Sequence, residues 1–220
     1  MEDSPVMALL PRNWYHILLA AAYLLSAALS QASAATESAD DTDWQLQERD
    51  KQISVYTREV EGSPYLAVKA IALIDAPMAR VAQFLGDGDG CSQWRAMCKS
   101  SRVIDRPAQQ ERRVYLVLDF PWPVSDRDVV MHSATDIDPE SNTATVRLQS
   151  DSAQYPEGEY VRAKSTGRYI LRPVGETQVE FTYIMHTDPG GGLSAGMVNA
   201  RLTTTTLEDI RRLVGNWRRR

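Results

Sequence analysis

The feature that most constrains the fold is an apolar stripe near the C-terminus of the chain. Its members fall on one face of an α-helix: Met197, Val198, Leu202, Leu207, Ile210, Leu213, Val214 and Trp217. This spacing predicts a helix of about five turns with a single apolar face. A helix this long and one-sided has to bury that face, and a sheet built by the rest of the chain is the expected partner.

Most of the remaining sequence consists of segments rich in β-branched and aromatic residues, which favour strands. Clusters of Pro, Gly, Asp or Asn separate them, so consecutive strands should pair in antiparallel fashion. The segments are residues 44–46, 53–55, 65–74, 103–104, 114–120, 129–134, 144–148, 161–171 and 179–185. We therefore predict an α+β fold, in which one curved antiparallel sheet of about nine strands wraps around the long C-terminal helix. A curved sheet over a helix leaves a space where apolar ligands bind.

An apolar run at residues 17–29 follows Arg12 and precedes the small residues 32–34. This order is typical of a secretory signal peptide, and the run is too short to span a bilayer comfortably. We therefore expect residues 1–34 to be a signal peptide and the protein to be exported, to the periplasm. An uncleaved membrane anchor is the main alternative, and a buried core helix is the next.

The segment after this leader is small, acidic and without periodicity, so we interpret residues 35–43 as a solvated linker. The folded domain is expected at residues 44–217, with a basic tail at 218–220. The chain has a net charge of −5, and its basic residues are scattered apart from that tail. This distribution argues against a nucleic-acid partner.

Two cysteines, Cys91 and Cys98, are present. Their number and spacing exclude a C-x-x-C redox or zinc motif. In an oxidising compartment they can pair, although the spacing alone leaves the geometry open. We favour a small disulfide over two buried thiols.

Four motifs in consecutive order resemble the START family. They are the proline-containing loop and following strand at residues 120–130, the Tyr-Pro…Val-Arg segment at 155–162, the strand at 169–173, and the Asp-Pro-Gly-Gly segment with Val-Asn at 188–199. The resemblance covers residues 44–217. It implies a helix-grip fold with an internal tunnel that holds one hydrophobic molecule, often a sterol, phospholipid or ceramide, without chemistry.

The resemblance also implies that the loop at residues 121–126 and the last helix act as a gate. Pro121 and Pro123 flank Trp122 and stiffen this loop, and an exposed indole suits a membrane interface. A packed lid residue without membrane contact is the equal alternative for Trp122. Cholesterol-carrying relatives place a buried acid and a buried arginine near the positions of Val114 and Ser133, where this chain has no charge, so the resemblance implies a lipid carrier of unknown cargo.

Eight residues are predicted to contact the ligand: Trp94, Tyr115, Arg127, His132, Met185, Met197, Leu202 and Thr205. Arg127 either contacts ligand head groups or anionic lipid, or forms an ion pair with Asp128 that supports the fold. We favour the ion pair. Thr205 belongs to four consecutive threonines, of which one or two have to face the sheet. A hydroxyl there either bonds to a helix carbonyl, the favoured interpretation, or meets the ligand.

Two further patterns raise the question of catalysis. The G-x-S-x-G pattern at residues 192–196 is typical of hydrolases, but no histidine follows Ser194, so a turn at a helix start is favoured. His132 and His186 lack a third ligand for zinc. We therefore predict no catalytic residue, no metal and no cofactor.

Three functions remain. The first is a monomeric lipid-binding or lipid-transfer protein that touches membranes transiently. The second is a cyclase-like enzyme on the same helix-grip architecture, and the third is a non-catalytic envelope interaction protein whose own side chains fill the cavity.

Overall fold

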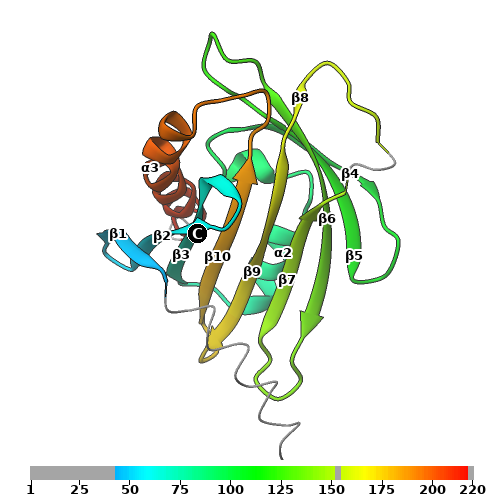
Figure 1. The fold of residues 1–220 in the computed structure, drawn as a ribbon. Coiled ribbons are helices and arrows are strands. Elements are labelled where there is room, and N and C mark those ends of the chain that lie inside the picture. The colour runs from blue at the N-terminus through cyan, green and yellow to red at the C-terminus, as the bar shows by residue number, and fades with distance from the viewer. Residues whose placement is uncertain (1–42, 152–154, 218–220) are drawn as a thin grey trace, which may run out of the picture. The chain divides into compact units, whose positions relative to one another are not determined.

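A single ten-stranded sheet dominates the part of the chain that the computed structural model describes, residues 43–151 and 155–217 (Figure 1). The predicted signal peptide, the linker up to residue 42 and the basic tail at 218–220 lie outside the described residues. The described strands and helices all belong to one compact unit, which begins at Trp44.

The strands are β1 (Gln45–Asp50), β2 (Ile53–Val60), β3 (Ser63–Ile74), β4 (Cys98–Asp105), β5 (Glu111–Leu118), β6 (Arg127–Ile137), β7 (Ala144–Ser150), β8 (Val161–Arg162), β9 (Lys164–Val174) and β10 (Gln178–Asp188). The helices are α2 (Met78–Gly86), the single 3₁₀ turn η2 (Cys91–Gln93) and α3 (Ala195–Gly215).

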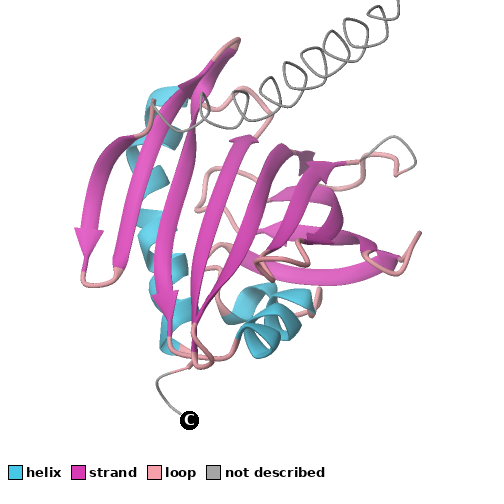
Figure 2. Ribbon diagram, turned by 90° about the horizontal axis from the view of Figure 1, so that it is seen from below, coloured by secondary structure: helices cyan, strands magenta, loops and turns pink. Residues whose placement is uncertain are grey.

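The strands are ordered β1-β2-β3-β10-β9-β7-β6-β5-β4, and neighbours on this path are antiparallel. The two-residue strand β8 lies off the path and pairs with β6 in parallel. The sheet curves around its inner face (Figures 1 and 2). The predicted α+β, helix-grip architecture is confirmed. About nine strands were predicted and ten are present, because the predicted segment at residues 161–171 is divided into β8 and β9.

Both α-helices pack on the inner face of the sheet (Figure 2). The long helix α3 contacts β2 and β3, whereas α2 contacts β9 and β10. The two helices therefore cover different parts of the curved sheet. Neither helix among the described residues is long and apolar enough to cross a membrane.

The apolar stripe of α3 is buried only toward its C-terminal end. Leu207, Ile210 and Leu213 are at most 4 % exposed, whereas Met197 in the first turn is 57 % exposed. The first turns are held instead by Asn199, which accepts a hydrogen bond from the Leu66 N–H at 3.0 Å and donates one to a carbonyl of the same strand. The single buried face predicted for the whole stripe is therefore wrong for its first turns.

The segment between α2 and β4 is fixed by a disulfide between Cys91 and Cys98, whose Cα atoms lie 5.9 Å apart. Within this loop the Arg95 N–H donates to the Cys91 carbonyl at 2.8 Å. The cross-link and the turn together fix where Trp94 and Arg95 project.

Candidate functional site

A cavity of about 80 Å³ lies between the inner face of the sheet and the segment that runs from α2 through η2. Apolar side chains of β5, β6, β7 and β10 form much of its wall: Val114, Leu116, Met131, Val146, Leu148 and Met185. Leu85 of α2, Cys91 of η2 and Trp94 complete the apolar lining. All described lining residues belong to the sheet or to this segment, and α3 contributes none. This cavity therefore does not lie between the sheet and the C-terminal helix, where the sequence analysis expected the ligand space.

The strand register decides which side chains face this cavity. Partners in an antiparallel pair lie on the same face, and the pairs Arg112↔Ser133 and Val114↔Met131 join β5 to β6. All four residues line the cavity. Because side chains alternate along a strand, Tyr115 lies on the opposite face.

An aromatic cluster packs beside the cavity. The Trp94 ring centroid lies 6.1 Å from that of Tyr169 and 6.3 Å from that of Tyr183, both at edge-on angles. The two tyrosine rings stack on each other with centroids 5.6 Å apart. Burial raises the pKa of Tyr169 and of Tyr183, so both phenols stay neutral at physiological pH. This wall therefore combines apolar rings with uncharged hydroxyl groups.

Arg95 lines the cavity and has an acidic neighbour on α3. Its Nε lies 3.8 Å from Oδ2 of Asp209, and the other carboxylate oxygen of Asp209 accepts a hydrogen bond from the Ala96 N–H at 2.6 Å. Asp209 is 7 % exposed, and burial raises its pKa although the Arg95 charge opposes this effect. The pair ties the lining segment to α3, and its two charges offset each other.

Arg112 is the second cation of the lining. Its Nη1 donates to the Gly86 carbonyl at 2.7 Å, which joins β5 to the end of α2. Burial lowers the pKa of Arg112, and the charge of Arg106 lowers it further. Sequence reasoning considered only Val114 and Ser133 on this wall and missed Arg112. Arg112 lies two residues before Val114, the first residue of a predicted strand, and side chains two residues apart in a strand share one face. This spacing could have identified Arg112 from the sequence.

The loop between β5 and β6, which holds the predicted gate, exposes an indole: Trp122 is 93 % exposed. Asp126 closes the base of this loop. One of its carboxylate oxygens accepts the Phe120 N–H at 3.2 Å, and the other accepts Lys99 Nζ at 2.6 Å. The loop is therefore anchored at its ends while Pro121, Trp122 and Pro123 project into solvent.

Arg127 begins β6 immediately after this loop and is 3 % exposed. Its guanidinium donates to the carbonyls of Pro189 at 3.2 Å and Gly190 at 3.4 Å, and also to that of Ser125. It lies over the Phe120 ring, 4.8 Å from the centroid. Neither interpretation from the sequence describes it fully: Arg127 supports the fold, but through backbone carbonyls rather than an ion pair with Asp128.

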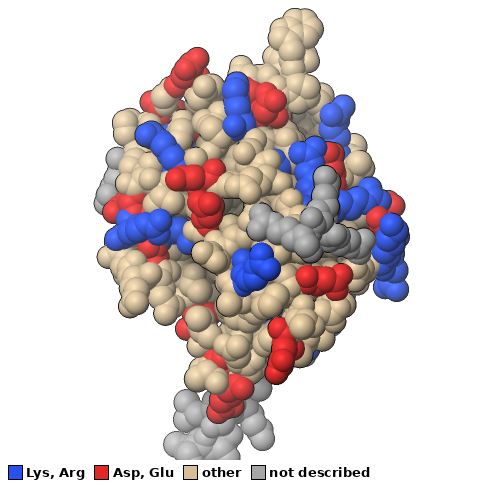
Figure 3. All heavy atoms as spheres, turned by 180° about the vertical axis from the view of Figure 1, so that it is seen from behind, with Lys and Arg blue, Asp and Glu red and all other residues tan. Residues whose placement is uncertain are grey.

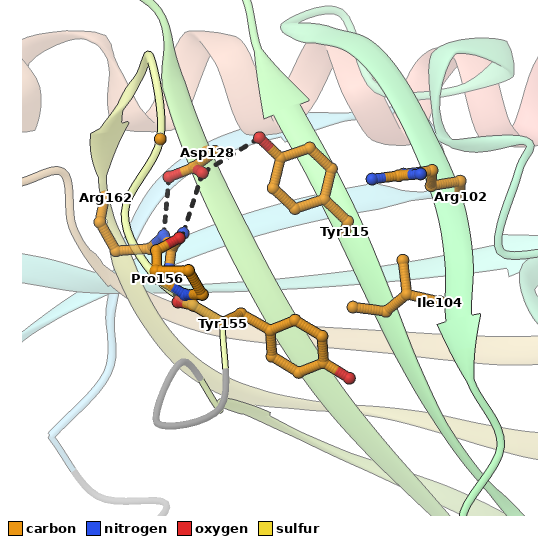
Figure 4. A pocket seen from close by; sticks show the side chains of 8 residues that line it. Arg102, Ile104, Tyr115, Asp128, Tyr155, Pro156 and Arg162 are labelled. Carbon is orange, nitrogen blue, oxygen red and sulfur yellow. Dashed lines mark hydrogen bonds and ion pairs between the residues drawn. The ribbon is translucent and has the colours of Figure 1, made fainter.

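Asp128 pairs with Arg162 instead. Nε and Nη2 of Arg162 lie 2.7 and 3.1 Å from the two carboxylate oxygens, and the Tyr115 hydroxyl donates to Asp128 at 3.1 Å (Figure 4). These three residues border a separate pocket of about 260 Å³ on the outer face of the sheet. Tyr115, predicted to contact the ligand, therefore lies outside the inner cavity.

Of the other predicted ligand contacts, some line the inner cavity and some do not. Trp94 and Met185 line the inner cavity. His132 lies on the outer face, with Nε2 3.2 Å from Glu111. The three predicted on α3 are not among the lining residues: Met197 is exposed, Leu202 packs against the core, and Thr205 is half-buried beside the buried Thr206.

The residues considered for chemistry are not brought together. His186 Nε2 lies 3.0 Å from the Ser63 hydroxyl, away from His132 and its Glu111 partner. Ser194 occupies the N-cap position of α3. Within the described ranges, no group of three or more His, Cys, Asp or Glu side chains is arranged to hold a metal ion.

Basic and acidic side chains are interspersed on the surface seen from behind the view of Figure 1 (Figure 3). This face presents small mixed groups of charge rather than one continuous field.

Comparison with known proteins places this architecture in a family. The START domain family matches residues 24–219. An uncharacterised protein of Pseudomonas aeruginosa is 29 % identical over 173 residues, covering 78 % of this chain and 85 % of the relative. The human ceramide transfer protein is 25 % identical over 185 residues, which cover 73 % of this chain but only 29 % of that longer protein.

Among solved structures, a STAR-related lipid transfer protein fragment from Xanthomonas axonopodis superimposes with a TM-score of 0.74 and 28 % identity. The superposition covers 80 % of this chain and 99 % of the fragment. The family match spans most of the sequence, and the sheet and the terminal helix agree with it. The chain therefore belongs to the START domain family.

Proposed function

We propose that the protein binds a single hydrophobic lipid in the inner cavity and transfers it between membranes after export to the periplasm. The observation that carries the proposal is the cavity, lined mostly by apolar side chains, between the sheet and the segment from Leu85 to Arg95, in a family whose members include lipid transfer proteins. Family membership supports lipid binding in general. The tunnel, the gate and the compartment are our proposals.

The cavity has to enlarge for a lipid to enter. Its volume is about 80 Å³, whereas sites for small organic ligands have about 300–1,000 Å³. We propose that the end of α2 around Leu85 shifts, because it lies outside the sheet and before the loop that the Cys91–Cys98 disulfide closes. Opening of the cavity is therefore part of the proposed cycle.

The exposed loop between β5 and β6 is the proposed membrane contact and gate. Trp122 is 93 % exposed, and indoles favour the membrane–water interface. The Arg127 guanidinium connects this loop to the turn before α3. Insertion of Trp122 into a membrane would thus act on the two elements that the gating hypothesis requires to move.

Binding without catalysis is the preferred function. The histidines that a cyclase-like mechanism would employ, His132 and His186, bond to Glu111 and Ser63 and do not line the inner cavity. Besides its apolar side chains, the described cavity wall presents guanidinium, hydroxyl and aromatic groups and the carboxylate of Asp87, and we propose that these groups recognise the ligand.

Native mass spectrometry of the protein purified from its own host tests lipid binding, and transfer of a fluorescent lipid between vesicles tests transport. We expect one retained lipid per chain and transfer that depends on protein concentration. A protein that retains no lipid, and that fails to accept any when incubated with vesicles, would contradict the proposal. Ceramide is one cargo to include, since the ceramide transfer protein is a relative.

A further inference from the structure

We infer that the lipid carries an anionic head group, a carboxylate or a phosphate, which binds to the Arg112 guanidinium inside the inner cavity. This inference rests on the proposed function and specifies its class of cargo. It follows from the position of Arg112, from the charges around it and from the chemistry of a guanidinium group.

The position of Arg112 is fixed by the sheet. Its pairing with Ser133 places both side chains on the inner face, and both line the cavity. One hydrogen bond, from Nη1 to the Gly86 carbonyl at 2.7 Å, holds the guanidinium against the end of α2. A guanidinium has five N–H donors in a planar fork, so donors remain for a second partner.

The two cations of the cavity lining have different partners. The cation of Arg95 has Asp209 as its neighbour at 3.8 Å, but none of the carboxylates in the described part of the chain forms an ion pair with Arg112. Asp87 also lines the cavity, and its Oδ1 accepts the Asp89 N–H at 3.3 Å. The charge of Arg106, another cation, lowers the pKa of Arg112 further.

A partly desolvated cation without a counter-ion is unfavourable, and the lowered pKa of Arg112, caused first by burial, reflects this. An anionic ligand supplies an ion-pair partner for Arg112, whereas a neutral one does not. Carboxylates and phosphates also fit the fork with two parallel hydrogen bonds. The cavity volume of about 80 Å³ accommodates such a group, while the acyl chain requires the cavity to enlarge.

The test compares three lipids with the same acyl chain: palmitic acid, palmitoyl lysophosphatidic acid and monopalmitoylglycerol. Binding to the full chain is measured by calorimetry for the wild type, Arg112→Gln, Arg112→Lys and Arg102→Gln. Arg102 is a matched control, since it is an exposed arginine that borders the outer pocket. Thermal unfolding of each variant verifies that it is folded.

We expect the wild type to bind at least one of the anionic lipids about tenfold or more tightly than the monoglyceride. Arg112→Gln should remove this preference by weakening anionic binding alone, Arg112→Lys should keep most of it, and Arg102→Gln should keep all of it. The anionic lipid that binds more tightly identifies carboxylate or phosphate as the head group.

Equal binding of the anionic and neutral lipids by the wild type overturns the inference but leaves the proposed function intact. An equal loss for all three lipids in Arg112→Gln also overturns it, since the residue then supports only the fold. If Arg112→Gln does not fold, the inference is tested by the preference of the wild type for anionic over neutral lipid and by the lipid affinities of Arg112→Lys. If none of these or of the vesicle lipids bind, the proposed function itself fails.

Discussion

The guanidinium of Arg127 donates a hydrogen bond to the carbonyl of Pro189 at 3.2 Å, across 62 positions of sequence. This contact joins the start of β6 to the turn that precedes α3. The same side chain bonds to Ser125 in the exposed loop. The loop and the start of the terminal helix are therefore coupled through one buried cation.

Replacement of Arg127 by Met should destabilise the fold by about 2–4 kcal/mol, because several carbonyls lose a charged donor in a buried site. Urea unfolding followed by circular dichroism measures the change. Arg127→Lys, which keeps the charge but not the planar fork, should recover only part of the stability. An unchanged unfolding midpoint for Arg127→Met would show that these hydrogen bonds contribute little.

Replacement of Trp122 by Ala should slow lipid extraction from vesicles and leave the free energy of unfolding within about 0.5 kcal/mol of wild type, because the indole is exposed. Ile137→Ala provides the matched control. Ile137 is an exposed apolar residue at the other end of β6. Equal extraction rates for wild type and Trp122→Ala would count against membrane insertion of the loop.

Replacement of Tyr115 by Phe should cost about 1 kcal/mol of stability, since the Asp128 carboxylate loses a hydroxyl donor. It should not change lipid affinity, because Tyr115 lies on the outer face. Chemical denaturation and the lipid-binding assay together test both statements. A selective loss of lipid affinity would restore Tyr115 as a ligand contact.

Acid should loosen the loop between β5 and β6. The hydrogen bond from Lys99, followed by that from the Phe120 N–H, lowers the pKa of Asp126 below its ordinary value of 3.8. A carboxylate whose pKa is lowered by folding contributes its full stabilisation at pH values above its pKa in the unfolded chain. This stabilisation disappears as the pH falls through its pKa in the folded protein. Lipid exchange should therefore accelerate below pH 3.8, as Asp126 becomes protonated.

The Asp126→Asn variant should exchange lipid rapidly already at neutral pH and show no further acceleration from this group in acid. Stopped-flow fluorescence measures exchange, and circular dichroism at each pH verifies that the protein remains folded. A variant with the wild-type exchange rate and pH profile would separate Asp126 from the gate.

Much of the architecture could be predicted from local patterns. Alternating β-rich segments and the one-sided stripe ending at Trp217 indicated a sheet with a terminal helix, because both periodicities are properties of neighbouring residues. The loop with Trp122 was also recognisable, since prolines on both sides hold it away from regular structure. The disulfide favoured between Cys91 and Cys98 is present in the structure.

The lining of the cavity was decided only by the tertiary structure. In β5 the residues Val114, Tyr115, Leu116 and Val117 are all apolar or aromatic, so alternation does not tell the inner face from the outer one. The pairing with β6 settles the choice, turning Arg112 inward with Val114 and Tyr115 outward.

The ion-pair and hydrogen-bond partners of charged residues also could not be predicted from their neighbours in the sequence. Asp128 lies next to Arg127 in sequence but pairs with Arg162, and Arg127 bonds to carbonyls near Pro189 instead. Adjacent residues of a strand point to opposite faces, so they are poorly placed to pair. The sequence by itself determined the succession of strands along the chain and the terminal helix, whereas long-range pairing determined the order of strands in the sheet and which side chains meet in the site.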